Sequence, residues 1–250
     1  MRRAEAYGRS MVRGALPLVG LLILGTGVAV AGERPPTVVE LFTSEGCNSC
    51  PPADALLGEL LKRNDVIALS YHVDYWDYLG WKDTFASKLT TDRQRSYGAS
   101  LGSNYVYTPQ MVIGGTTDAV GSDAQAVSEA IAKREQSPDN VPVMVSEPAA
   151  GKILVSVPSA KVKRDAVLWL VRYDSKHTVA IQRGENSGSS ITYYNVVRDI
   201  EKLGHWDGQA TAINVDPASL GAAEHALVLL QTGGTGPIIG SAKLPDHSGS

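Results

Sequence analysis

The pattern of apolar and polar positions in residues 32–138 alternates between strand-like and helix-like periods. Apolar runs at 37–42 and 66–73 predict two strands. Between them, leucines recur at helical spacing over 53–63, and a second, interrupted helical pattern covers 84–101. Because strands and helices alternate in this way, the pattern predicts a layered α/β fold.

Shorter elements complete this half of the chain. Two glycines, Gly114 and Gly115, join two apolar runs and indicate a β-hairpin. A helix follows, for which Ser122 or Asp123 is the expected N-cap. The predicted elements are strands at 110–113 and 117–120 and a helix that ends near residue 136.

The pattern changes after this helix. Residues 137–140, Ser-Pro-Asp-Asn, are typical of turns, and short strands separated by turn residues follow them. We therefore place a domain boundary after residue 138 and predict that 139–245 forms a β-rich domain, a sandwich or a jelly roll. Residues 246–250 are expected to form a loose tail. The expected strands are 141–146, 152–157, 166–173, 178–183, 191–197, 211–215, 226–231 and 238–242.

Residues 1–31 have the three parts of a secretory signal peptide. Four arginines precede or flank an apolar stretch at 15–28, and Ala29-Val30-Ala31 resembles a cleavage site. An uncleaved membrane anchor is the alternative, but glycines interrupt a run that is short for a membrane span. We therefore expect an exported protein, periplasmic or secreted, with no stable membrane span after cleavage.

Loss of this segment makes the remaining chain more acidic. The segment carries four arginines and one glutamate, so its removal changes the formal net charge from −3 to −6. Nucleic-acid-binding domains depend on basic surfaces, so no nucleic-acid partner is expected. Export also places the chain in an oxidising compartment, where a disulfide can persist.

The two cysteines of the chain, Cys47 and Cys50, form a C-x-x-C motif between the first predicted strand and the first predicted helix. Cys47 falls at or just before the helix start, where free backbone N–H groups and the helix dipole favour a thiolate, the attacking species in disulfide exchange. Cys50 lies deeper, where it can attack a mixed disulfide formed at Cys47. Glu45 opposes the effect of the helix start, because a nearby carboxylate raises the pKa of a thiol and so disfavours the thiolate.

The order of strand, C-x-x-C helix, strand, helix, hairpin and final helix resembles the thioredoxin fold over 32–138. This resemblance implies that Pro109, just before the third strand, forms a cis peptide bond and lies against the sulfurs. It also implies that Thr108 pairs with the backbone of a substrate chain. Thioredoxins carry a buried acid beneath the second cysteine that takes part in proton transfer. Glu40 is the nearest candidate here, one residue further from Cys47 than that acid usually lies.

Three segments resemble, more closely, an exported bacterial family named domain of unknown function 1223. They are 40–54 around the cysteines, 71–81 with the sequence Tyr-His-Val-Asp-Tyr-Trp-Asp-Tyr-Leu-Gly-Trp, and 107–113 around Thr108 and Pro109. The resemblance spans most of the chain that follows the signal peptide. It implies a thioredoxin-like domain with an appended β-rich region, and no settled activity.

The aromatic segment 71–81 leaves the second strand near the edge at which open α/β sheets bind ligands. Trp76 is therefore a candidate for binding substrate or for covering the disulfide. The alternative is that these aromatic side chains pack beneath the β-rich region, since aromatic residues mostly serve packing. His72 alone is more typical of a hydrogen-bonded structural histidine than of a ligand.

We expect an exported thiol–disulfide exchange protein without a cofactor. In this interpretation Cys47, Cys50 and Pro109 are catalytic, and Thr108 and Trp76 bind substrate. The partners are protein thiols or disulfides, or a redox partner protein. The Asn-Ser spacer between the cysteines differs from the Gly-Pro and Pro-His spacers of well-known oxidoreductases, which leaves the reducing or oxidising direction open.

Two other functions stay open at this stage. A copper-binding chaperone would use Cys47, Cys50 and His72 as metal ligands, because soft thiolates suit Cu(I). A non-catalytic binding module would keep the two cysteines as an inert local disulfide.

Overall fold

The computed structural model describes Met1 and residues 34–246, so the expected signal peptide and residues 247–250 lie outside the described residues. The described part contains eleven strands, three α-helices and two short 3-10 helices, η1 (Asp77–Leu79) and η2 (Pro217–Leu220). Asp246, the one described residue of the expected tail, is hydrogen-bonded to His225 (2.8 Å). None of the helices in residues 34–246 has the length and apolar character needed to cross a membrane.

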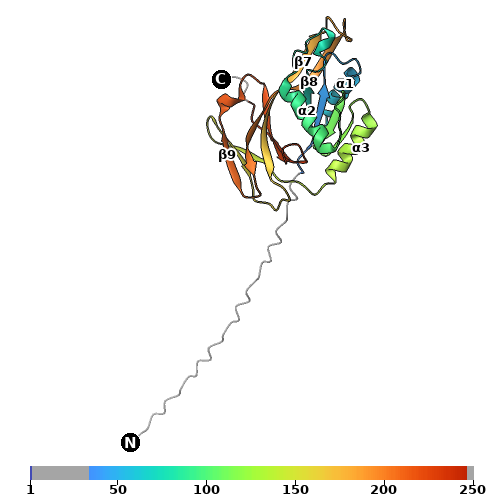
Figure 1. The fold of residues 1–250 in the computed structure, drawn as a ribbon. Helices are drawn as coiled ribbons and strands as arrows, with labels where there is room; N and C mark the ends of the chain where they lie inside the picture. The colour runs from blue at the N-terminus through green and yellow to red at the C-terminus, as the bar shows by residue number, and fades with distance from the viewer. Residues whose placement is uncertain (2–33, 247–250) are drawn as a thin grey trace. The chain divides into compact units, whose positions relative to one another are not determined.

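Eight strands form one mixed sheet in the order β11-β10-β7-β8-β2-β1-β3-β4 (Figure 1). β1 (Thr37–Thr43) runs parallel to β2 (Val66–His72) and antiparallel to β3 (Gln110–Ile113). β3 forms the predicted hairpin with β4 (Thr117–Val120). β1, β2 and β3 are buried along their whole length, which agrees with their continuous apolar runs. The predicted α/β character of this half is confirmed.

Local sequence signals determine where the three α-helices begin. α1 (Pro51–Leu60) starts with two prolines, which are tolerated because N–H groups of the first turn have no intrahelical partner. α2 (Lys88–Leu101) begins with a capping box built on Ser87. α3 (Ala124–Glu135) is capped by Asp123, one of the two predicted N-cap residues.

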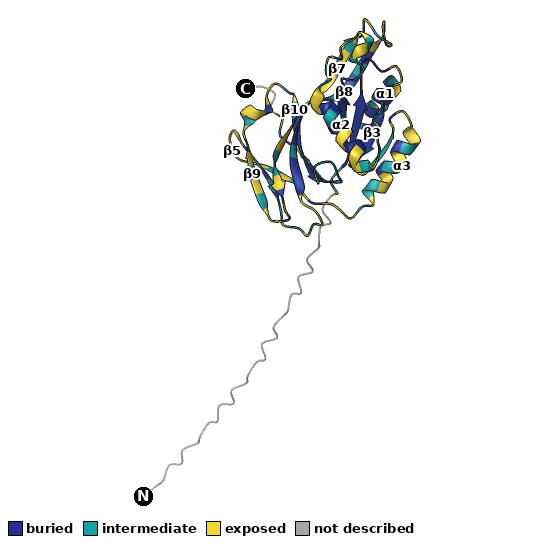
Figure 2. Ribbon diagram, viewed as in Figure 1, coloured by how far each residue is buried: buried dark blue, intermediate teal, exposed yellow. Residues whose placement is uncertain are grey.

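α1 and α3 lie on one face of the sheet, and α2 lies on the other. Val39 and Leu41 of β1 belong to the core that α1 and α3 cover, whereas Val38 and Phe42 belong to a core that includes Tyr97 of α2. Because successive strand side chains point to opposite faces, odd-numbered residues of β1 face α1 and even-numbered ones face α2. Figure 2 shows the buried strands between the helices. This arrangement is compatible with the expected thioredoxin-like architecture.

Two long strands extend the sheet past residue 138. β7 (Ala166–Ala180) and β8 (Ser190–Trp206) form an antiparallel hairpin, and β8 pairs in parallel with β2. The sequence predicted two strands, 166–173 and 178–183, where β7 is continuous. That prediction was wrong because residues 174–176, Asp-Ser-Lys, resemble a turn. A register shift in the pairing of β7 with β8 lets the strand continue through them.

The remaining strands form the predicted β-rich region. β10 (His225–Thr232) and β11 (Ile238–Lys243) complete the large sheet beside β7. A second sheet contains β5 (Met144–Ala149), β6 (Lys152–Val157) and β9 (Thr211–Val215). A hydrophobic core with side chains from β6, β7, β9 and β10 joins the two sheets as a sandwich. Strands from both sides of residue 138 share the large sheet, so the sheet itself does not mark a boundary there. The division into two domains at this residue stays a prediction.

Candidate functional site

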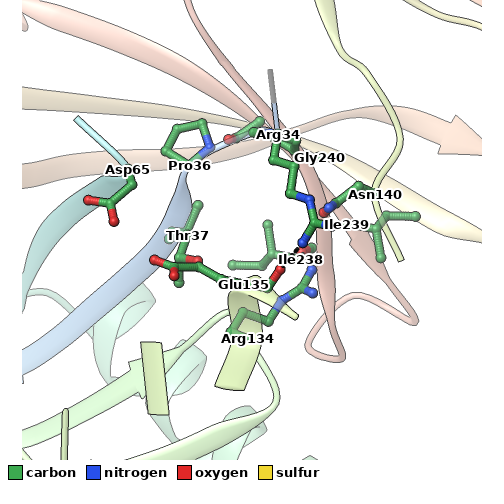
Figure 3. A pocket seen from close by; sticks show the side chains of 13 residues that line it. Arg34, Pro36, Thr37, Asp65, Arg134, Glu135, Asn140, Ile238, Ile239 and Gly240 are labelled. Carbon is green, nitrogen blue, oxygen red and sulfur yellow. Dashed lines mark hydrogen bonds between the residues drawn. The ribbon is translucent and has the colours of Figure 1, made fainter. Parts of the chain in front are cut away.

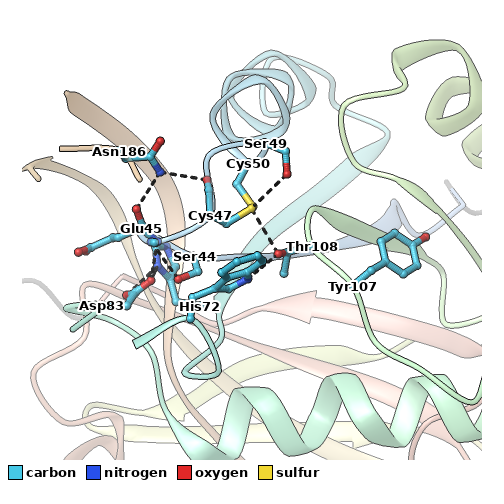
Figure 4. Close-up of a disulfide and its surroundings, with 12 residues drawn as sticks. Ser44, Glu45, Cys47, Ser49, Cys50, His72, Asp83, Tyr107, Thr108 and Asn186 are labelled. Carbon is cyan, nitrogen blue, oxygen red and sulfur yellow. Dashed lines mark hydrogen bonds and ion pairs between the residues drawn. A yellow bond between two sulfur atoms is a disulfide. The ribbon is translucent and has the colours of Figure 1, made fainter. Parts of the chain in front are cut away.

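Cys47 and Cys50 form a disulfide in the turn between β1 and α1, with their Cα atoms 5.4 Å apart (Figure 4). The Cys47 N–H donates to the Ser44 carbonyl (3.1 Å), and the Cys50 N–H donates to the Cys47 carbonyl (3.2 Å). Cys50 is the N-cap residue of α1, which begins at Pro51. The strand end and the helix start therefore hold the two cysteines in one tight turn.

The helix start does not supply the free N–H groups that the sequence led us to expect near the sulfurs. Pro51 and Pro52 have no N–H group. The N–H groups of Ala53 and Asp54 both donate to the Cys50 carbonyl, at 2.8 and 3.1 Å. Residues 51–54 therefore offer the sulfurs no free backbone N–H group.

Two hydroxyl groups lie against the sulfur of Cys47. The Thr108 hydroxyl donates to Cys47 Sγ (3.3 Å), and the Ser49 hydroxyl lies 3.4 Å from the same atom (Figure 4). Trp76 Nε1 in turn donates to Thr108 Oγ1 (2.8 Å), and the peptide bond between Thr108 and Pro109 is cis. The structure thus brings together the cysteines, Thr108, Pro109 and Trp76, all of which the sequence selected.

The disulfide is covered in this conformation. Neither Cys47 nor Cys50 has solvent-exposed surface. Trp76 packs closely against the same turn, because a Cβ atom on Gly46 would lie only 3.0 Å from Trp76 Cβ. Another molecule can reach the sulfurs only if the groups around this turn move.

A residue from the distant β7–β8 connection anchors the cysteine turn. Asn186 Nδ2 donates to the carbonyl oxygens of Glu45 (2.8 Å) and Cys47 (3.0 Å), and the Asn186 residue is buried (Figure 4). Sequence reasoning did not select Asn186 as a site residue. No local pattern identifies it, because its place depends on pairing between strands far apart in the chain.

Glu40, the residue selected for proton transfer, lies in a different environment. Its carboxylate accepts a bond from Arg93 Nε (2.8 Å) and another from the Tyr97 hydroxyl. Glu40 is an even-numbered residue of β1 and therefore faces α2, whereas α1, which carries Cys50 at its start, packs on the other face. The structure does not place Glu40 with the cysteines.

Asp54 is a buried acid on the same side of the sheet as the cysteines. It lies in the first turn of α1, four residues after Cys50, and only 2% of it is exposed. Burial raises the pKa of Asp54 to about 7, and the charge of His72 opposes this shift only in part. Its position three residues before Leu57, on the buried stripe of the helix, is the signal by which the sequence could have identified it.

His72 forms a buried ion pair with Asp83. His72 Nδ1 lies 2.9 Å from Asp83 Oδ2, and neither side chain is exposed. Burial alone would lower the pKa of His72, but the Asp83 carboxylate outweighs it and the net shift is upward. For Asp83, burial alone would raise the pKa, but pairing with His72 outweighs burial and the net shift is downward. Asp83 also accepts a bond from the Glu45 N–H (2.7 Å), which links the pair to the cysteine turn.

Glu45 joins this buried pair. Burial, with the nearby Asp83 charge, raises the pKa of Glu45, although Trp81 Nε1 donates to one of its carboxylate oxygens (2.5 Å). Within residues 34–246, one group of three potential metal ligands has its ligand atoms within 4.8 Å of one another, and it consists of Glu45, His72 and Asp83. In the disulfide form, His72 is therefore grouped with carboxylates and not with the cysteines.

A separate cavity of about 300 Å³ lies away from the cysteine turn, at the start of β1 (Figure 3). Arg34 and Arg134 line it, but both guanidinium groups bind backbone carbonyls: Arg34 that of Glu135, and Arg134 that of Ile238 (2.6 Å). None of the residues selected from the sequence lines this cavity.

Comparisons with known proteins identify the family. The model of the family described as protein of unknown function (DUF1223) matches residues 38–231. The crystal structure of protein AGR_C_4864 from Agrobacterium tumefaciens has a TM-score of 0.75 and 35% sequence identity, over 88% of this chain and 98% of that one. HBP35 of Porphyromonas gingivalis has a TM-score of 0.59 at 13% identity, over 87% of this chain and 77% of that one, and shows similarity of fold alone. No curated protein matches the chain. The chain belongs to the family of proteins of unknown function DUF1223.

Proposed function

We propose that this protein carries out thiol–disulfide exchange at Cys47 and Cys50 after export. The observation that carries this proposal is the hydroxyl of Thr108 donating to Cys47 Sγ, directly before the cis bond to Pro109. A hydroxyl donor stabilises a sulfur most when that sulfur is a thiolate, because bonds to charged acceptors are the stronger ones. Cys47 is therefore the sulfur that forms the mixed disulfide.

The exchange is a two-electron step in which each bond is accounted for. A substrate thiolate attacks Cys47 Sγ, the bond between Cys47 and Cys50 breaks, and Cys50 leaves as a thiolate that takes up a proton. A second substrate thiolate then attacks the substrate sulfur of the mixed disulfide and releases Cys47. The substrate dithiol becomes a disulfide, and the protein disulfide becomes a dithiol. The reverse sequence reduces a substrate disulfide.

Asp54 is the residue we propose for proton transfer at Cys50, in place of Glu40. It lies on the helix that Cys50 caps, and its pKa of about 7 lets it exchange protons near neutral pH. Glu40 is held by Arg93 and Tyr97 on the opposite face of the sheet.

One observation favours a second function. Both sulfurs are fully covered, as expected for a disulfide that is a structural part of a binding module. The two functions differ in whether Cys47, once freed from Cys50, attacks another disulfide.

A pair of single-cysteine variants tests the proposal. Cys50→Ala and Cys47→Ala are each mixed with a small aromatic disulfide, and formation of the mixed disulfide is followed by absorbance and by intact mass. We expect Cys50→Ala to react faster than Cys47→Ala, by up to about tenfold, because only Cys47 accepts the Thr108 bond and an attacking thiol needs thiolate character. Equal rates, or no reaction of Cys50→Ala, would favour the inert disulfide.

A further inference from the structure

Four ionisable side chains are buried together under the cysteine turn: Glu45, Asp54, His72 and Asp83. None of them is more than 2% exposed. Three of the four are carboxyl groups, and within residues 34–246 the one basic side chain that pairs with any of them is His72. With all four ionised, the group would carry a net charge of −2. Buried charge is costly unless it is paired, so protons or a cation must compensate it.

The same group contains polar atoms without hydrogen-bond partners. They are Glu45 Oε1, His72 Nε2 and both carboxylate oxygens of Asp54, beside which lies the Thr43 hydroxyl, an open group itself. Nearly all buried polar atoms in native proteins have a partner, so four such atoms in one group point to something they bind. The Asp54 carboxyl is within electrostatic reach of His72 and Asp83, so its open oxygens belong to this group.

The spacing of three members of the group is compatible with a shared metal ion. One ligand atom each from Glu45, His72 and Asp83 lies within 4.8 Å of the others. Oxygen and nitrogen ligands at about 2.0–2.2 Å from a common ion lie roughly 3–4.4 Å from one another, so a small contraction would bring these atoms into range. Imidazole with carboxylates suits a first-row transition metal such as zinc.

We propose that Glu45, His72 and Asp83 bind a divalent first-row transition metal ion, with Asp54 as an additional carboxyl group beside it. The carboxylates of Glu45 and Asp83 balance the two charges of the ion. A ligating imidazole is neutral, so binding of the ion releases one of the two ring protons of a charged His72. The three ligands include neither cysteine, so this proposal can be tested separately from disulfide exchange; Asp54 alone takes part in both.

Zinc uptake by the oxidised protein tests the site. The disulfide is left intact, so the thiolates cannot act as ligands. The protein is unfolded in urea with a chelator, refolded with or without Zn²⁺, desalted and analysed for zinc and protein. Refolding gives the ion access to a site that is closed in the folded protein. We expect one zinc ion per chain, and a loss of at least about tenfold in zinc affinity for His72→Gln.

His177→Gln is the matched control. His177 Nε2 lies 2.8 Å from Asp174 Oδ2, but this pair is partly exposed, so the same substitution there should leave zinc uptake unchanged. Glu45→Gln is the second variant, in case His72→Gln fails to refold, and we expect a similar loss. Absence of zinc in the parent protein, zinc uptake by both site variants equal to that of the parent, or uptake that appears only after the disulfide is reduced would each overturn the proposal.

Discussion

Two groups of buried polar side chains lie on opposite faces of β1 and β2, and they differ in how completely they are paired. On the α2 face, Arg93 binds Glu40 through Nε (2.8 Å) and also contacts the Tyr97 hydroxyl (3.0 Å) and Gln231 (3.1 Å). None of these four residues has a buried polar atom without a partner, and the open atom next to them is the neutral hydroxyl of Tyr71, whose ring lies under the Arg93 guanidinium. On the α1 face, the group around His72 has four such atoms.

The difference separates a structural network from a candidate site. A buried charge whose partners are all present in the fold stabilises one arrangement of the core, and no further ligand is needed to explain it. A buried charge whose hydrogen-bonding atoms are open needs a proton, water or an ion to compensate it. We therefore interpret the Glu40 network as structural, and the comparison supports the proposal that the group around His72 binds an ion.

Breaking the α2-face network should have the largest effect on stability. Arg93→Leu leaves the Glu40 carboxylate buried without its cation, so we expect the free energy of unfolding to fall by about 3–5 kcal/mol. Urea denaturation followed by fluorescence measures it. Arg95→Leu is the control, because Arg95 is exposed on the same helix. Similar losses in both variants would show that Glu40 does not depend on Arg93.

Asp54 should make stability fall as pH rises, in protein kept free of metal by a chelator. The pKa of Asp54 is about 7 in the folded protein and about 3.9 in an unfolded chain, so between these values the folded state binds more protons. Unfolding therefore becomes easier as pH increases from about 4 to 7, by at most about 4 kcal/mol. We expect Asp54→Asn to remove much of this decline, as measured by denaturation across the range.

The groups that face Asp54 set the remaining pH dependence in that experiment. They come from β2, the segment after η1 and β8: His72, Asp83 and Tyr193. Glu45, in the cysteine turn, interacts in turn with His72 and Asp83. The raised pKa of His72 also contributes stability that is lost as pH rises, so Asp54→Asn should retain a smaller decline. An unchanged pH profile in Asp54→Asn would contradict the assignment of an unpaired acid to this face.

Asn186 links the site on the α1 face to the β7–β8 hairpin. Substitution of Asn186 should have an intermediate effect on stability. Asn186→Ala leaves the carbonyl oxygens of Glu45 and Cys47 without their donor, which we expect to cost about 1–3 kcal/mol of stability. The disulfide should also be reduced faster by a small thiol, which thiol titration over time measures. Ser187→Ala, a change at an exposed neighbour, should alter neither quantity.

We expect the smallest effect, on the rate at which Cys47 attacks a disulfide, from removing the Thr108 hydroxyl. Thr108→Val keeps the side-chain shape and removes the donor to Cys47 Sγ, a bond worth about 0.5–1.5 kcal/mol, together with the acceptor of the Trp76 Nε1 bond. In a Cys50→Ala background, we expect the Thr108→Val change to slow the attack of Cys47 on a small disulfide by less than about tenfold. Ser49→Ala provides the comparison for the other hydroxyl, and a Thr108→Val rate equal to that of the parent would remove Thr108 from the proposed mechanism.

Most local elements of the fold could be predicted from the sequence. The strands at 110–113, 117–120, 152–157 and 211–215 have the predicted bounds, because each is a short apolar or alternating run between turn residues. The long strands β7 and β8 were missed in part. The length of these strands depends on pairing with distant strands of the sheet, and the local sequence pattern carries no information about that pairing.

The site divides in the same way. A C-x-x-C motif after a strand and a proline before another strand identified Cys47, Cys50, Thr108 and Pro109, and the structure brings them together. Asn186 and the pairing of His72 with Asp83 arise from contacts between distant segments, and no spacing rule predicts them.

The reduction potential of the disulfide between Cys47 and Cys50 tests the central claim most directly. The protein is equilibrated with thiol–disulfide buffers of stated ratio, and the oxidised fraction is measured by thiol labelling and mass. Thiol–disulfide exchange proteins have potentials between about −270 and −120 mV, and we predict a value in that interval. A value below about −300 mV would identify a structural disulfide and contradict the proposed function.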